Sequence, residues 1–288
     1  MRPPLSAGAA LRLRLRPRRH FSFCAGGVFP YSRTKLKHLN MTINPAKPVA
    51  ERYFYFIATV LLLGLTVTGF QLFYFHSQAY PGRPLTPPIK TLLITHGVAM
   101  SLWMLLAIIQ PFLIASGNRR VHMALGKVAA VIAVGLVVLC IKLGIAAERI
   151  APPDMMHGPL TPKQFLAVPV LNIALFALFV AAGVGWRKRP DIHKPMMFLA
   201  SLTVVAAAIA RIDFFNHLYA GTVWQKIFGN LFFTLVIGAV FVITKCAVFQ
   251  KFDHWLVAGY GVMVVWFLMI AQGAATPAWD AIASFLLR

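Results

Sequence analysis

The amino-acid sequence predicts an all-α protein, a polytopic membrane bundle of about seven transmembrane helices with its N-terminus inside and its C-terminus outside. Of the 288 residues, 59% are hydrophobic and only 12% are charged, with a mean hydropathy of +0.73. A soluble domain could not cover that much apolar surface, whereas a bilayer is itself an apolar solvent for it. The apolar residues also gather in runs of about 20, the length that crosses a hydrocarbon core of roughly 30 Å.

Residues 1–50 form a basic tail, separate from the bundle expected over residues 51–275. The tail has no acidic residue and contains LRLRLRPRRH, from Leu11 to His20. Arg-rich, acid-free leaders are typical of organelle transit peptides. The alternation of Leu and Arg has a period of two, however, whereas a transit helix needs a period of 3.6. A natural start at Met41 is the slightly favoured interpretation. It implies a bacterial inner membrane, and a transit peptide over residues 1–40 would imply the mitochondrial inner membrane.

Seven apolar runs follow the tail in order. Tyrosines near both ends of the first run are typical of membrane interfaces. A Pro-rich loop follows that run, and a turn-rich loop over 148–164 separates the third run from the fourth. Residues 276–288 are too short to cross and predict an interfacial helix. The expected spans are Tyr53–Phe75, Thr91–Ala115, Val128–Ala147, Phe165–Trp186, Met196–Phe215, Gly229–Phe249 and Trp255–Gln272.

The basic residues of the turns predict the orientation. Turns on one side carry Arg119, Arg120 and Lys127, then 187–189 with Lys194, then Lys251. The opposite loops carry fewer basic residues: Arg83 and Lys90, a nearly balanced loop over 148–164, and Lys226. Because cytoplasmic loops are rich in Lys and Arg, this pattern favours N-in and C-out. The chain has 28 basic residues against 7 acidic ones, a formal charge of +21. The basic residues lie mainly in the first fifty positions and in the turns between apolar runs. They therefore predict contact with the lipid bilayer and no nucleic-acid partner.

Three inner turns place a histidine at the start of the next span, at His122, His193 and His254. The preceding span of each pair carries one polar residue near its outer end. These polar residues are His96, Asn172 and Asn230. The pattern predicts three helix hairpins of one ancestral type, although apolar spans also resemble one another through composition alone.

Ionisable residues within spans are costly and point to function. The topology gathers such a set near the outer side: His76, His96, Lys142, Asn172, Arg211, Asp213 and His217. Simpler interpretations remain open for several of them. Lys142 can reach the headgroups, Asp213 can neutralise Arg211 or Lys142, and asparagines often bond neighbouring helices. His96 is harder to explain in this way, because Gly97 beside it leaves a gap for a flat ligand or another helix.

The histidines predict a haem- or metal-binding site. Imidazole is the common neutral ligand of haem iron and copper, and haem between membrane helices takes axial histidines from two of them. His122 with His193 could bind haem b, copper or iron at the inner face, and His96 with His217 could do so at the outer face. Nearby Arg and Lys would then meet the haem propionates. The alternative for His254 is a solvated residue.

The segment THG…W…Q…RRVH…LG, followed by DIHK-x-M-x-x-A and Arg211, resembles an uncharacterised family of bacterial multi-pass membrane proteins. The resemblance covers roughly Thr91 to Arg211. Members have H-[RK]-x-[LM] turns and are distantly similar to b-type cytochromes and oxidase-assembly membrane proteins. The resemblance implies haem chemistry or a place in a respiratory membrane complex. Unlike the ligands of a b-type cytochrome, His122 and His193 begin their helices.

A haem- or metal-binding electron-transfer protein is therefore the first functional prediction. A proton-coupled small-solute transporter, with Lys142, Asn172, Arg211 and Asp213 lining a cavity, is the first alternative. An assembly or scaffold subunit of a respiratory complex is the second, supported by small residues in the spans. These residues are Gly135, Ala206, Ala207, Ala208, Gly238, Gly259 and Gly261. The sequence has no hydrolase, kinase or P-loop motif, and whether the protein is an enzyme stays open.

Overall fold

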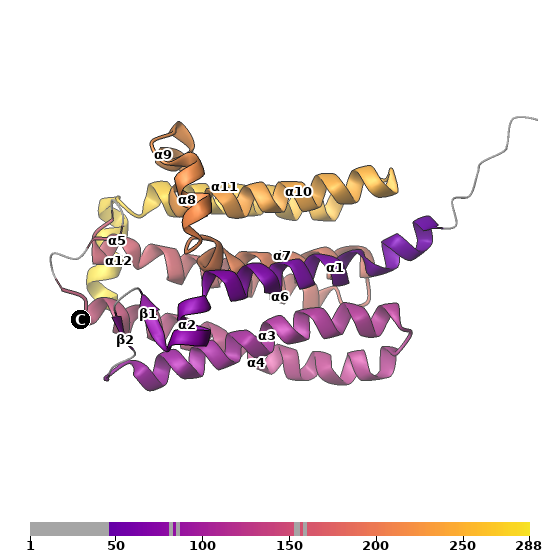
Figure 1. Cartoon of the computed structure of the whole chain (residues 1–288), viewed down its shortest axis with the longest axis horizontal. Helices are drawn as coiled ribbons and strands as arrows, with labels where there is room; N and C mark the ends of the chain where they lie inside the picture. Colours follow the sequence, from indigo (N-terminus) through magenta and orange to yellow (C-terminus); the bar gives the residue numbers. More distant parts are fainter. Residues whose placement is uncertain (1–45, 81–82, 85–86, 153–155, 158–159) are drawn as a thin grey trace, which may run out of the picture. The chain divides into compact units, whose positions relative to one another are not determined.

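The computed structural model describes residues 46–80, 83–84, 87–152, 156–157 and 160–288 (Figure 1). The predictions for the basic tail, including the start at Met41, lie outside these residues up to position 45. Seven helical spans among the described residues are long and apolar enough to cross a membrane, which confirms the predicted multi-pass helix bundle. The long helices are α1 (Ala46–Gly69), α3 (Lys90–Ala115), α4 (Arg119–Arg149), α6 (Ala167–Gly185), α7 (Pro190–Ile209), α10 (Phe232–Phe249) and α11 (His254–Gly273).

Short elements gather at one end of the bundle (Figure 1). We name this the outer end and the opposite one the inner end, after the predicted orientation, which stays a prediction. An antiparallel pair of two short strands lies here, and α12 stands where a short C-terminal helix is expected. The elements are α2 (Gln71–His76), β1 (Gln78–Tyr80), β2 (Arg83–Pro84), α5 (Pro162–Phe165), α8 (Asp213–Tyr219), α9 (Val223–Phe228), the 3-10 helix η2 (Gly229–Leu231) and α12 (Pro277–Leu286).

Several helix ends differ from the expected bounds, and both α1 and α7 also begin earlier than expected, at Ala46 and Pro190. Helix α4 begins at Arg119 and not at Val128, because Asn118 accepts a hydrogen bond from the backbone N–H of Val121 and caps the helix. Basic residues can occupy these first turns because they lie beyond the apolar run. Helix α1 ends at Gly69, and α7 ends at Ile209. The apolar segments beyond those two ends form α2 and α8, so apolar composition overestimated both spans.

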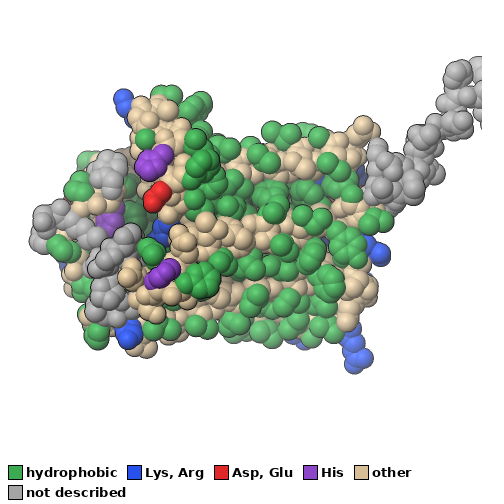
Figure 2. Space-filling view, viewed as in Figure 1, with side chains coloured by type: hydrophobic (Ala, Val, Ile, Leu, Met, Phe, Trp, Pro, Cys, Tyr) green, Lys and Arg blue, Asp and Glu red, His purple; other side chains and the backbone are tan. Residues whose placement is uncertain are grey.

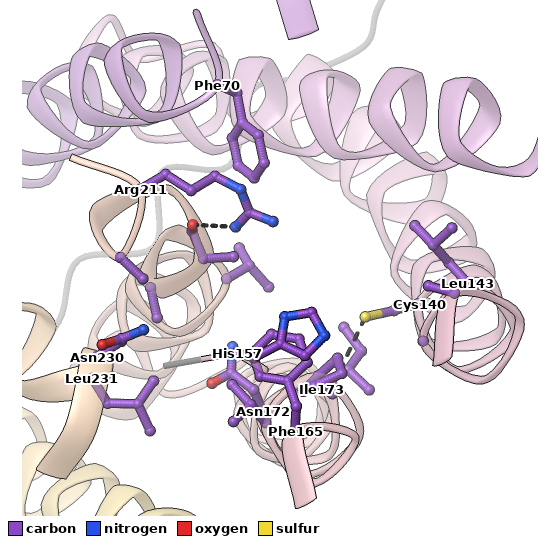
Figure 3. Close-up of a pocket in the computed structure, with 18 of the residues that line it drawn as sticks. Phe70, Cys140, Leu143, His157, Phe165, Asn172, Ile173, Arg211, Asn230 and Leu231 are labelled. Carbon is purple, nitrogen blue, oxygen red and sulfur yellow. Dashed lines mark hydrogen bonds between the residues drawn. The ribbon is translucent and has the colours of Figure 1, made fainter. Parts of the chain in front are cut away.

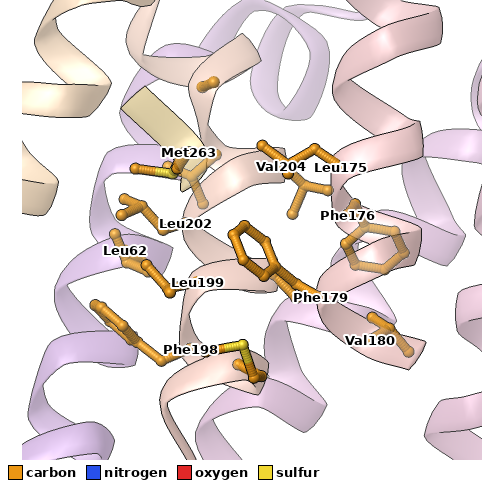
Figure 4. Close-up of a cluster of buried hydrophobic side chains, with 14 of the residues drawn as sticks. Leu62, Leu175, Phe176, Phe179, Val180, Phe198, Leu199, Leu202, Val204 and Met263 are labelled. Atoms are coloured by element: carbon orange, nitrogen blue, oxygen red, sulfur yellow. The ribbon is translucent and has the colours of Figure 1, made fainter. Parts of the chain in front are cut away.

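Helix α7 lies at the centre of the bundle. Within its span 78% of the residues are buried, against 17–39% in the other six. It packs against α1, α3, α6, α10 and α11. Figure 4 shows the resulting core, in which Leu199 and Leu202 of α7 lie among side chains of α1, α6 and α11. The outer surface of the long helices is largely apolar, as lipid contact requires (Figure 2).

Close helix contacts use only part of the predicted small-residue set. A Cβ atom on Gly259 of α11 would meet Leu199, and one on Gly238 of α10 would meet Tyr260 and Leu202. Gly135 and Gly261 have nothing within 4 Å of a Cβ position. The closest approach of all involves Gly69 of α1, whose Cβ position falls against the backbone of Ala208 in α7.

A buried polar cluster joins three helices at the inner end. Lys245 of α10 donates hydrogen bonds to Asp253 and to the hydroxyl of Tyr55 in α1, the latter at 2.6 Å. Only 12% of the Lys245 side chain and 19% of the Asp253 side chain are exposed. Asp253 also accepts a bond from the N–H of Leu256 and so caps α11. Lys245 was not among the predicted functional residues, although it is a single charge within an apolar span.

Candidate functional site

A cavity of about 790 Å³ opens near the outer end of the bundle (Figure 3). Helices α3, α4, α6 and α7 supply the largest shares of its wall, and α1, α2, α9, η2 and α11 contribute fewer residues. The wall is largely apolar, with Met100 and Met104 along α3 and Ile173 on α6. Ligand cavities in proteins typically measure about 300–1,000 Å³ and combine apolar walls with a few polar groups. The cavity fits that description.

His96 lies in the second turn of α3 and lines this cavity. Its Nδ1 atom is buried and has no hydrogen-bond partner among the described residues. An unbonded imidazole nitrogen at this depth is costly unless a bound molecule engages it. The gap expected beside Gly97 is filled, because a Cβ atom there would meet the ring of Phe73 at 2.6 Å. The space next to His96 is the cavity itself.

Asn172 of α6 also lines the cavity and is only 9% exposed. Its Nδ2 donates to the carbonyl of Thr203 in α7 at 3.0 Å, which fixes the amide as an interhelical bond. Its Oδ1 is buried without a hydrogen-bond partner in the described part of the chain. Asn230 of η2 lines the same cavity. The three polar residues at matched outer positions, His96, Asn172 and Asn230, therefore converge on one space, while their origin by repetition stays a prediction.

Arg211 lies just beyond the C-terminus of α7, at the opening of the cavity. It is exposed and also lines the cavity, and its guanidinium is 4.8 Å from the ring centroid of Phe70 (Figure 3). Its Nη1 donates to the carbonyl of Ala207 at 2.6 Å, which holds the side chain in place. Lys90 and Lys226 line the cavity as well. Three cationic side chains therefore line the cavity, a charge distribution that favours anionic ligands.

The cavity also contains an acid–histidine pair that the sequence analysis missed. Glu148, in the last turn of α4, is 8% exposed, and its Oε2 lies 3.5 Å from Nε2 of His157. Both residues line the cavity. Neither residue was among the predicted site residues, and both belong to the stretch that was expected to form a turn-rich loop over 148–164. A lone acid at the end of an apolar run was the available signal.

The other predicted outer residues lie elsewhere. Lys142, Asp213, His217 and His76 are exposed and do not line the cavity. Asp213 and His217 share helix α8 with the expected four-residue spacing, but α8 is separate from α7. The structure therefore brings together His96, Asn172 and Arg211, and it does not bring His217 to His96. The exposed position of Lys142 agrees with a side chain that reaches the headgroups.

The predicted inner pair does come together. The rings of His122 and His193 have centroids 6.2 Å apart at an interplanar angle of 88°. Each ring also bonds the preceding helix of its own hairpin. The Nδ1 of His193 lies 2.7 Å from the carbonyl oxygen of Gly183 in α6. In the amide orientation that satisfies both of its ends, Gln110 of α3 donates to His122 Nδ1 and to the His122 carbonyl oxygen.

The surroundings of this inner pair disfavour a bound cation. His122 and His193 are each the fourth residue of a helix, where the helix dipole is positive. Arg119 and Arg120 add charge in the first turn of α4. The 790 Å³ cavity, which could hold a macrocycle, includes neither histidine. The two rings are best explained as contacts that join α3 to α4 and α6 to α7.

Replacing His193 with alanine is therefore expected to lower the free energy of unfolding by about 1 kcal/mol, the usual net value of a hydrogen bond. Thermal unfolding of the purified protein in detergent, followed by circular dichroism, measures the change. His254→Ala is the matched control. His254 also begins a helix after an inner turn, but it is exposed, and its ring centroid lies 4.9 Å from that of Phe252. Equal losses in the two variants would contradict the joining role of His193.

Fold and site together define a polytopic helix-bundle membrane protein with one amphipathic cavity described at its outer end. Comparison of the chain with protein-family models, with curated proteins and with solved structures found no match. The function is therefore inferred from the residues that line the cavity of about 790 Å³.

Proposed function

We propose that the protein is a redox protein of the membrane that holds haem b in the cavity lined by His96, with His96 as the iron ligand. The unbonded, buried Nδ1 of His96 inside an apolar cavity of about 790 Å³ carries the proposal. Either imidazole nitrogen can bind a metal, and histidine is a common axial ligand of haem iron. The sequence also predicted His217, which lies outside this cavity, and so the proposal uses a single histidine.

The rest of the cavity suits the shape and charge of haem b. A porphyrin is flat and mainly apolar, as are the side chains along the wall, and its two propionates are acidic. Arg211 at the opening would bind a propionate through charge-assisted hydrogen bonds, and Lys90 and Lys226 would add positive charge there. When bound, haem iron supplies one-electron transfer.

Each residue then has a defined task. His96 holds the iron, Arg211 orients the acidic edge, and Phe70 positions the Arg211 guanidinium. The apolar wall excludes water. A redox protein of this kind needs an electron-transfer partner, and a respiratory complex of an inner membrane is the partner we propose. The transporter alternative has less support, because Lys142 and Asp213 do not line the cavity.

Absorption spectra of the purified full-length protein test the proposal. The wild-type protein is expected to show a Soret band, and reduction should shift it. His96→Ala should lower haem occupancy by about tenfold or more, as the loss of a metal ligand does.

His217→Ala is the matched control, since His217 belongs to the same predicted pair but lies outside the cavity. It should retain full haem occupancy. A colourless wild-type protein, both as purified and after incubation with haemin, would refute the proposal. So would a Soret band that is unchanged in His96→Ala.

A further inference from the structure

A second cavity of about 590 Å³ lies at the outer end, beside the first. Residues 161–164 around α5, the 274–276 turn and the α12 residue Asp280 line it. Only two residues line both cavities, Glu148 and Ala151. Glu148 therefore lies between the first cavity, which we name the membrane cavity, and the second, which we name the outer cavity.

His157 is held on the membrane-cavity side of Glu148. Its N–H donates to the carbonyl of Leu160 at 2.9 Å, and the N–H of Leu160 donates back at 3.3 Å. Its ring stacks on Phe165 with centroids 4.0 Å apart and an angle of 18° (Figure 3). These contacts position Nε2 at 3.5 Å from Glu148 Oε2. Side-chain exposures of 14% for His157 and 4% for Glu148 place the pair in a low-dielectric setting.

We propose that Glu148 and His157 form a proton-exchange site that connects the outer cavity with the membrane cavity. A proton from water in the outer cavity binds the Glu148 carboxylate. It then passes from Oε2 to Nε2 of His157, and the imidazolium so formed releases a proton from Nδ1. Carboxylate and imidazole suit this role, because both can change charge near neutral pH when buried. The inference does not depend on which ligand the membrane cavity holds.

The cations around the pair disfavour its protonation, and a ligand that becomes more negative offsets them. The membrane cavity contains His96, Arg211, Lys90 and Lys226, and the outer cavity contains the ion-paired Lys163 and Asp280. Arg149, next to Glu148, instead donates to the carbonyl of Leu286 at 3.2 Å. In a low dielectric, an added electron or an arriving anion is strongly stabilised by a nearby proton. The pair can supply that proton from the outer end.

Infrared difference spectroscopy of the full-length protein in lipid nanodiscs, cycled in pH, tests the inference. A protonated-carboxyl band is expected in the wild-type spectrum, and it should shift in D₂O. Glu148→Gln should remove the band. His157→Gln should keep the band but change its frequency and its pH midpoint. Asp280→Asn, which removes the other carboxylate of the outer cavity, should leave the band unchanged.

A second pair of variants tests the route through the outer cavity. Ala275 lines the outer cavity, so Ala275→Trp would fill it. After transfer to D₂O, the carboxyl band of this variant should shift several-fold more slowly than that of the wild type. Ala281 of α12 lines neither cavity, so Ala281→Trp should leave the rate of the band shift in D₂O unchanged. Three results would overturn the inference. The carboxyl band could persist in Glu148→Gln, its frequency and pH midpoint could be unchanged in His157→Gln, or its hydrogen–deuterium exchange could be as fast in Ala275→Trp as in the wild type. If Glu148→Gln does not fold, the His157 and Ala275 variants still decide. A missing Soret band would leave this test intact.

Discussion

Replacement of Lys245 with methionine is expected to lower the free energy of unfolding by about 3–5 kcal/mol, the cost of breaking a buried ion pair from one side. The Lys245 ammonium donates to Asp253 and to the Tyr55 hydroxyl, and it also lies 4.3 Å from the centroid of the Tyr55 ring. Its loss leaves the Asp253 carboxylate mostly buried without its cation. The contacts that join α10 to α1 and α11 disappear together.

Reversible unfolding in mixed micelles, followed by circular dichroism, would measure this loss. The double variant Lys245→Met with Asp253→Asn should recover most of the stability, because asparagine is neutral and still caps α11. Lys251→Met removes an exposed lysine of the same turn and should have almost no effect. A loss below about 1 kcal/mol in Lys245→Met would mean that the pair behaves like a surface salt bridge.

Gly69→Ala is expected to destabilise the bundle by about 1–3 kcal/mol, the usual cost of overpacking. The new Cβ would fall against the carbonyl oxygen, carbonyl carbon and Cα of Ala208. Backbone atoms of the central helix cannot move aside as a flexible side chain can, so α1 and α7 must separate. Because α7 packs against five other helices, that separation disturbs much of the core.

Gly64→Ala on the same helix is the matched control, because nothing lies within 4 Å of its Cβ position. Alanine favours helix over glycine by about 0.8–1.0 kcal/mol, so Gly64→Ala should be neutral or stabilising. The same unfolding measurement in mixed micelles compares the two variants. Effects of the same sign and size would show that the α1–α7 approach is not tight.

Much of the fold could be predicted from composition and span length. Runs of about 20 apolar residues identified all seven spans, since only a helix satisfies its own backbone in lipid. The helix ends were less accurate. The expected spans included residues 70–75 and 210–215, yet α1 and α7 stop before them. The close contact at Gly69 and the turn at Arg211 depend on neighbouring helices, which the local sequence does not report.

The candidate site was predicted in part. His96, Asn172 and Arg211 could be found because a polar residue within an apolar run is conspicuous and topology places all three near one end. His217 and Asp213 were grouped with them because they were placed at the outer end of the fifth span, which was expected to run to Phe215. Glu148 and His157 were missed, because their pairing depends on how the loop after α4 packs on Phe165.

The sequence by itself determined that this chain crosses a membrane in seven helices, because lipid requires long apolar runs with internally satisfied backbones. The sequence also determined that His96, Asn172 and Arg211 lie near one end of the bundle. Only the tertiary structure decided that α7 is the central helix, although its span has a mean hydropathy of 1.6, below that of five other spans. In lipid, apolar residues suit the outside of a bundle as well as its inside, so hydropathy does not reveal burial. The cavity likewise depends on side-chain packing between helices that are distant in sequence.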